Sequence, residues 1–137
     1  MYQRILAPLK QDETDDAVIE HAGYLAGLTG GRVTLLHVVH SHSRDELVYR
    51  EEQGRKYLEA WAARLTDRAV SAATRVVPGE PAEAITRLAR EEKMDVIVMA
   101  THGHSEVRHL FMGSVTEHVV RNGDLPVLLV RPAEDAK

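Results

Sequence analysis

Short apolar runs alternate with amphipathic stretches along nearly the whole chain, and this alternation limits the folds that the sequence can adopt. The runs typical of strands cover residues 5–9, 32–39, 73–77, 95–99 and 126–130. Four segments with apolar residues at helical spacing separate them. The order β-α-β-α-β-α-β-α-β predicts an α/β fold, a five-stranded parallel sheet with helices on both faces.

The helix ends carry recognisable capping residues. Asp12 and Asp45 are expected to cap the first and second helices, and Pro81 suits the first turn of the third. The fourth helix is expected over residues 113–121. One face of the second helix should consist of residues spaced by three or four: Gly54, Leu58, Trp61, Leu65 and Ala69.

Length and composition narrow the class of protein. The 137 residues predict one domain over 1–137 that is large enough for a core. A net charge of -4 argues against nucleic-acid binding through phosphate contacts. The chain has no cysteine, which fits a reducing cytoplasm, and we expect a cytoplasmic protein. Because its apolar runs are short and no signal-peptide core is visible at the start, no membrane association is expected.

One stretch, residues 99–116, has the pattern of a phosphate-binding loop. A strand leads into Gly103, and a nine-residue excursion then ends at Gly113-Ser114, where a helix begins. A helix N-terminus has unpaired N–H groups and a partial positive charge, and glycine lets a ligand approach the backbone. In a parallel sheet, ligands bind beyond the C-terminal strand ends, so the loops at 8–12, 38–42 and 100–113 are the candidates.

Charge separates the two helix starts near this edge. The first helix opens with acids that would repel a phosphate: Asp12, Glu13, Asp15 and Asp16. The fourth opens with Gly113-Ser114-Val115-Thr116 and has no acid before Glu117. We therefore expect the anion at the fourth helix. The alternative, a glycine and a serine that only cap the helix, stays open from spacing alone.

The loop resembles the universal stress protein motif Gly-x2-Gly-x9-Gly-(Ser/Thr), the ATP-binding signature of one branch of that family. Here it reads Ala100-x2-Gly103-x9-Gly113-Ser114. The resemblance extends over the whole chain, through Ile5-Leu-Ala-Pro8, Leu36-His-Val38, Gly79-x-Pro81 and Pro126-Val-Leu-Leu-Val130. It implies a Rossmann-like domain, similar to the adenine nucleotide alpha hydrolases.

The resemblance also implies roles for individual residues. Pro8, Leu9, Lys10 and Val38 would line an adenine pocket. The ribose and phosphates would lie along Met99, Ala100 and His102, and the phosphates would be wrapped by Gly103, Gly113, Ser114, Val115 and Thr116. The implied ligand is ATP or another adenine nucleotide, with Mg or Mn carried by its phosphates. The implied assembly is a homodimer through the last strand, Val127 to Val130, whose apolar edge would otherwise be exposed.

Two positions depart from the family pattern. Ala100 replaces the first glycine of the motif and adds one methyl group near the ligand. Lys10 stands where an aspartate is usual, and an ammonium can donate hydrogen bonds but cannot accept them. Lys10 either reaches toward phosphate or pairs with Asp12 or Glu13; we favour the pairing. These departures leave open a dimeric interaction module that does not bind nucleotide.

Other chemistry finds less support in the sequence. Histidines at 37, 40 and 42 and at 102 and 104 suggest a metal site, yet no carboxylate stands at a ligand spacing, and no metal site is expected. Walker, dinucleotide-binding and nucleophile-elbow motifs are absent. The predicted function is a nucleotide-binding stress or regulatory protein, a dimeric sensor or scaffold with an unidentified protein partner. No enzymatic activity beyond slow ATP hydrolysis is expected.

Overall fold

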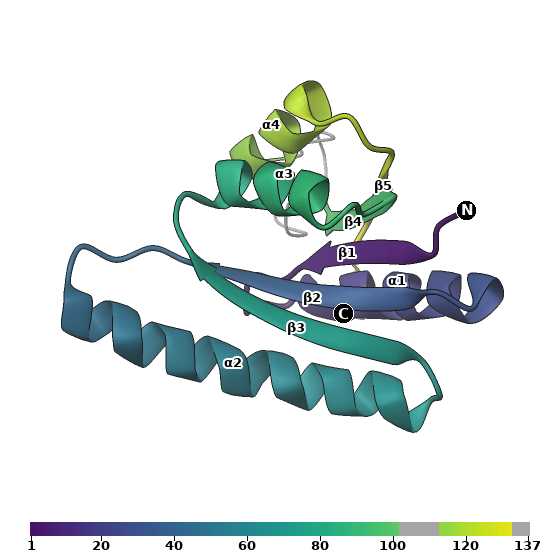
Figure 1. Cartoon of the computed structure of the whole chain (residues 1–137), viewed down its shortest axis with the longest axis horizontal. Coiled ribbons are helices and arrows are strands. Elements are labelled where there is room, and N and C mark those ends of the chain that lie inside the picture. The colour runs from purple at the N-terminus through teal and green to yellow at the C-terminus, as the bar shows by residue number, and fades with distance from the viewer. Residues whose placement is uncertain (102–112, 133–137) are drawn as a thin grey trace, which may run out of the picture.

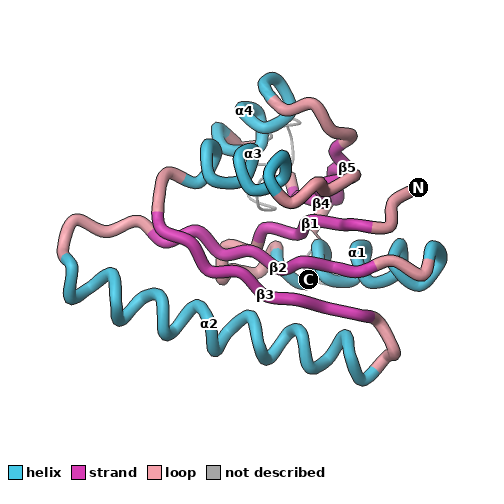
Figure 2. Tube along the Cα trace, viewed as in Figure 1, coloured by secondary structure: helices cyan, strands magenta, loops and turns pink. Residues whose placement is uncertain are grey.

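A computed structural model describes residues 1–101 and 113–132, and in this part of the chain strands and helices alternate as predicted (Figure 2). The elements are β1 (Arg4–Pro8), α1 (Asp15–Thr29), β2 (Arg32–Val39), α2 (Arg44–Asp67), β3 (Ser71–Pro78), α3 (Pro81–Glu91), β4 (Val96–Ala100), α4 (Ser114–Asn122) and β5 (Val127–Val130). Pro81 begins α3, which confirms its predicted place in the first turn.

The strands form one parallel sheet in the order β3-β2-β1-β4-β5. The chain builds outward from β1 to β3 and then crosses to β4 on the other side of β1. Figure 1 shows α1 and α2 on one face of the sheet and α3 and α4 on the other. The predicted fold class, a five-stranded parallel sheet covered on both faces, is confirmed.

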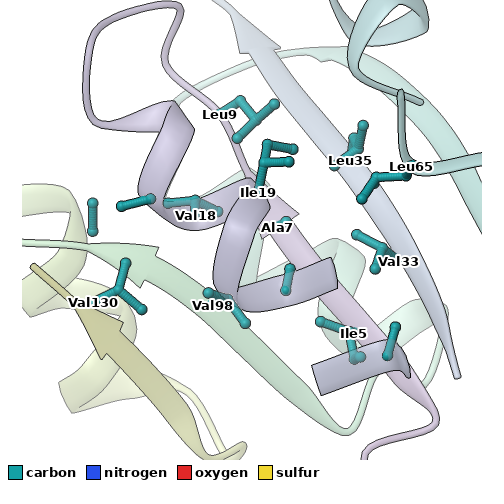
Figure 3. Close-up of a cluster of buried hydrophobic side chains, with 14 of the residues drawn as sticks. Ile5, Ala7, Leu9, Val18, Ile19, Val33, Leu35, Leu65, Val98 and Val130 are labelled. Atoms are coloured by element: carbon teal, nitrogen blue, oxygen red, sulfur yellow. The ribbon is translucent and has the colours of Figure 1, made fainter. Parts of the chain in front are cut away.

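The core has two parts because alternate residues of each strand point to opposite faces of the sheet. On the α1 and α2 face, Ile5 and Leu35 pack against Val18 and Leu65, in the cluster drawn in Figure 3. On the other face, residues of β1, β2 and β4 pack against α3 and α4: Leu6, Leu36, Ile97 and Met99 with Ile85, Leu88 and Val119. Every residue of β4 is buried, as expected for an interior parallel strand.

Both predicted aspartate caps are wrong. Helix α1 begins at Asp15 with Thr14 in the cap position, while the Asp12 carboxylate accepts hydrogen bonds from the backbone N–H of Thr14 (2.9 Å) and from its hydroxyl (2.6 Å). Asp12 therefore forms a turn that precedes the helix. At α2, Ser43 takes the cap position, and its Oγ accepts from the backbone N–H of Glu46 (3.3 Å). Asp45 lies in the first turn, where its charge favours the helix dipole.

The predicted inner face of α2 is correct at Gly54, Leu58 and Leu65, which are buried, but it ends before Ala69. Helix α2 stops at Asp67, and Ala69 lies beyond it with a left-handed φ of 65°. The backbone N–H of Val70 bonds to the carbonyl of Leu65 (3.0 Å), so the helix closes with the kind of terminus that usually carries glycine.

Replacing Ala69 with glycine should stabilise the protein by about 1 kcal/mol, because glycine adopts the left-handed conformation without steric cost. The measurement is the free energy of unfolding in urea. The matched control is Ala63→Gly, the same change at an exposed position inside α2, which should destabilise by about 1 kcal/mol. Shifts of the same sign for both variants would contradict the assignment of strain at Ala69.

No helix within residues 1–101 and 113–132 is both long and apolar enough to cross a bilayer.

Candidate functional site

A crevice of about 390 Å³ lies beyond the C-terminal ends of the central strands. It forms where strand order reverses between the neighbouring strands β1 and β4: α1, which follows β1, and α4, which follows β4, lie on opposite faces of the sheet (Figure 1). All of the predicted binding residues that the structure describes line this crevice: Pro8, Leu9, Lys10, Val38, Met99, Ala100, Gly113, Ser114, Val115 and Thr116. The remaining two predicted residues, His102 and Gly103, lie outside the described residues.

One wall of the crevice is the beginning of α4. Gly113 precedes the helix with φ 85° and ψ 156°, a conformation that is essentially restricted to glycine. No side chain caps this helix start within the described residues, and the first intrahelical bond runs from the N–H of Glu117 to the carbonyl of Gly113. The backbone N–H groups of the first turn therefore remain available to an anion.

The charge of the other walls suits the same kind of ligand. Among the lining residues that the structure describes, Lys10 is the one permanently charged side chain, and none is a carboxylate. The Lys10 ammonium nitrogen lies 4.0 Å from an Asp12 carboxylate oxygen, and its side chain is 53% exposed. This contact agrees with the favoured interpretation that Lys10 pairs with Asp12, although at this length and exposure the pair holds the ammonium only weakly.

A buried carboxylate, Asp15, fixes the loop that carries Lys10. Its oxygens accept from the backbone N–H groups of Lys10 (2.9 Å) and Gln11 (2.8 Å) and from the Tyr57 hydroxyl (2.6 Å). Burial raises the pKa of the Asp15 carboxyl, and these hydrogen bonds partly offset that rise. Burial and the Asp15 carboxylate both raise the pKa of Tyr57, which stays a hydrogen-bond donor. The loop next to the crevice is thus tied through Asp15 to α2.

Asp15 corrects part of the sequence interpretation. We expected it to be one of the acids that repel phosphate from the start of α1. Instead its side chain points into the protein, where three donors surround it. Gln11, which one of those bonds holds, has a left-handed φ of 66°. The sequence shows that Asp15 follows Gln11 by four residues, but it does not show the left-handed turn at Gln11 that brings the Gln11 N–H to the Asp15 carboxylate.

His37 supports the same loop from β2. Its Nδ1 lies 3.0 Å from the Leu9 carbonyl oxygen, and Gly54 of α2 comes so close that an added Cβ would lie 2.9 Å from the imidazole Cδ2. Sequence reasoning did not assign His37 to the binding pocket. It also missed the other lining residues, which are Thr14, Val18, Leu36, Pro81 and Ile85. Only the strand register and the helix positions show that these side chains face the crevice.

The histidines do not assemble a metal site in the part of the chain that the structure describes. No three histidine, aspartate or glutamate side chains gather there as ligands would. The rings of His40 and His42 lie edge to face, 5.3 Å apart between centroids, and His37 bonds to the Leu9 carbonyl. His102 and His104 fall outside the described residues.

Comparison with known proteins places the chain in one family. The model of the universal stress protein family matches residues 1–131. A universal stress protein of Methanothermobacter thermautotrophicus is 33% identical over 143 residues, which cover 96% of this chain and 97% of that protein.

Solved structures agree in fold over nearly the whole length. The structure of MJ0577, a universal stress protein of Methanocaldococcus jannaschii, superposes with a TM-score of 0.85 at 29% identity and covers 98% of this chain and 99% of its own. A family member from Burkholderia pseudomallei gives 0.78 at 31% identity, with 96% and 97% covered. The shared fold and the match along the sequence lead to one conclusion: the chain belongs to the universal stress protein family.

Proposed function

We propose that this protein binds an adenine nucleotide, ATP among them, in the crevice and acts as a regulatory protein of the stress response. The observation that carries the proposal is the electrostatic character of the crevice. Within residues 1–101 and 113–132, its walls bring together the start of α4, which no side chain caps, and the Lys10 ammonium, and they include no carboxylate. A ligand with an apolar ring system and an anionic end matches these walls.

The type of nucleotide is suggested by relatives with the same fold. One universal stress protein has been solved in complex with cAMP, and one from Archaeoglobus fulgidus in complex with dAMP. In this chain we place the adenine between Leu9 and Val38 and the phosphates at Gly113, Ser114 and Thr116. Because the described part of the lining offers no carboxylate for a cation, Mg or Mn would arrive with the phosphates of the nucleotide.

Binding, rather than turnover, is the proposed role. Besides Lys10, the titratable side chain of the described crevice walls is His37, and its Nδ1 already contacts the Leu9 carbonyl. No group on these walls is therefore placed to activate a water against a terminal phosphate. The bound nucleotide would act by changing contacts with a second copy or with another protein.

The direct test is calorimetric titration with a non-hydrolysable ATP analogue, with and without magnesium. We expect saturable binding of one nucleotide per chain, and weaker binding of adenosine, which lacks the anionic group. Absence of binding at millimolar nucleotide would refute the proposal and favour the interaction module that does not bind nucleotide.

We also propose a homodimer through β5. This strand ends the sheet order and, within residues 1–101 and 113–132, pairs with β4 alone. Its two leucines, Leu128 and Leu129, are 39% and 37% exposed. An apolar edge strand is a natural site for association with an identical edge.

Leu129→Lys should convert a dimer to a monomer, because a lysine on an edge strand opposes edge-to-edge pairing. Sedimentation equilibrium measures the result. The control is Leu28→Lys on α1, a leucine that is 67% exposed and belongs to no strand, and this variant should stay dimeric. A dimer for both variants would exclude β5 as the interface.

A further inference from the structure

A second hollow, of about 480 Å³, lies beside the crevice at Lys10, between the end of β2 and the N-terminal half of α2. We call it the side hollow. Its walls are Lys10, Gln11, His37, Val38, Val39, His40, Tyr49, Arg50 and Gln53. Three of these residues, Lys10, His37 and Val38, also line the crevice, so the two spaces share one wall.

Basic side chains line the side hollow. Among the described residues its walls carry Lys10, Arg50 and two imidazoles and no carboxylate. Asp12 and Glu46, which do not line it, pair with the two cations at 4.0 Å and 2.8 Å. Gln53 adds an amide, and Tyr49 adds a ring that is largely exposed at the rim. Side chains that donate hydrogen bonds and carry positive charge gather here on a surface whose overall charge is negative.

Arg50 is oriented by Glu46, which does not line the hollow, and by the backbone carbonyl of His40, which lies on its wall. Its Nη2 lies 2.8 Å from a Glu46 carboxylate oxygen one helical turn away, and its Nη1 lies 3.5 Å from the His40 carbonyl oxygen. A guanidinium has five N–H donors, so these two contacts orient the group and leave further donors for a ligand. With its side chain 53% exposed, Arg50 remains accessible.

From this arrangement we propose that the side hollow is a second anion subsite of the nucleotide crevice. It would take a phosphate group carried by the same ligand at a point remote from the phosphates at α4. The inference rests on the proposed function and narrows its ligand class to adenine nucleotides with two separated anionic groups. Lys10, on the shared wall, would lie between the two groups.

The test compares ligands that differ by the second anionic group. Adenosine 3′,5′-bisphosphate, the extended ligand, is titrated against the wild-type protein, with AMP as its reference. We expect the bisphosphate to bind about tenfold more tightly than AMP, the size of one charge-assisted contact. Equal or weaker binding of the bisphosphate would overturn the subsite.

A variant on α2 assigns the effect to the side hollow. Arg50→Gln should remove the preference for the extended ligand and leave the affinity for AMP and ATP unchanged, because Arg50 does not line the crevice. The matched control is Arg55→Gln on the same helix, since Arg55 is similarly exposed and ion-paired but lies outside the side hollow. A preference that survives Arg50→Gln, or disappears in both variants, would overturn the assignment.

A probe without the nucleoside separates this inference from the proposed function. Inorganic pyrophosphate is added to isotope-labelled protein, and the amide resonances of His40, Arg50 and Gln53 are followed by NMR. We expect saturable shifts that Arg50→Gln abolishes. If no nucleotide binds but these shifts occur, the proposed function fails while the anion subsite stands. If nucleotides bind but the shifts are absent, the subsite fails alone.

Discussion

Ser114→Asp should weaken ATP binding by at least about 100-fold and at the same time make the protein slightly more stable. A carboxylate in the first turn of α4 interacts favourably with the helix dipole, by about 0.3–1 kcal/mol. The same charge would lie where we place the phosphates, and like charges about 4 Å apart near a protein surface repel by about 4 kcal/mol. The two effects have opposite signs, so a loss of binding cannot be ascribed to unfolding.

The control for this variant is Ser114→Asn, which keeps the shape of aspartate without its charge. It should bind ATP within about fivefold of the wild type, because the backbone N–H groups of the helix start are unchanged. Affinity is measured by calorimetry and stability by thermal unfolding without ligand. Wild-type affinity in the aspartate variant would place the phosphates elsewhere and remove α4 from the proposed site.

The fold was predictable because each strand and helix carries its own pattern and the patterns agree. Parallel strands such as β4 are buried on both faces and read as continuous apolar runs, and Pro81 and Gly113 mark helix starts from local chemistry alone. Cap positions were less predictable. Aspartate and serine side chains can both cap a helix, so residue type alone does not identify the cap. The backbone conformation of the preceding turn determines which side chain accepts a hydrogen bond from a free backbone N–H, as Ser43 does at α2 and Asp12 does in the turn before α1.

The candidate site was predictable where one segment supplies it and unpredictable where distant segments meet. Gly113 and Ser114 follow one another in a recognisable spacing. The contacts of Asp15 with Tyr57 and of His37 with Leu9 span 42 and 28 residues. The side hollow likewise joins the loop after β1 to α2. A single sequence does not show such long-range contacts, because they depend on the sheet order that places β1 beside β2.

Asp15→Asn should destabilise the protein at neutral pH by about 2 kcal/mol, because an asparagine cannot accept from both loop amides. The two backbone N–H groups, of Lys10 and Gln11, point at different oxygens of the carboxylate. In the variant one of them faces an NH₂ group and stays unsatisfied, at a cost of about 1–3 kcal/mol. The same loosening should weaken ATP binding, since Lys10 lines the crevice. Asp16→Asn, an exposed neighbour, is the control.

The difference in free energy of unfolding between the wild type and Asp15→Asn should depend on pH, because only the wild-type carboxyl at position 15 can titrate. Burial raises the pKa of its carboxyl in the folded protein above the ordinary value of 3.8, which holds for the unfolded chain. At a pH between the unfolded-state pKa and the folded-state pKa, the folded protein therefore binds more protons than the unfolded chain. Its free energy of unfolding must then rise as the pH falls through that window, a gain that the asparagine variant lacks. The wild-type advantage over Asp15→Asn should therefore widen from pH 7 toward pH 4, measured by urea unfolding at each pH. An advantage that narrows would mean that the three hydrogen bonds to the carboxylate outweigh the cost of burying its charge.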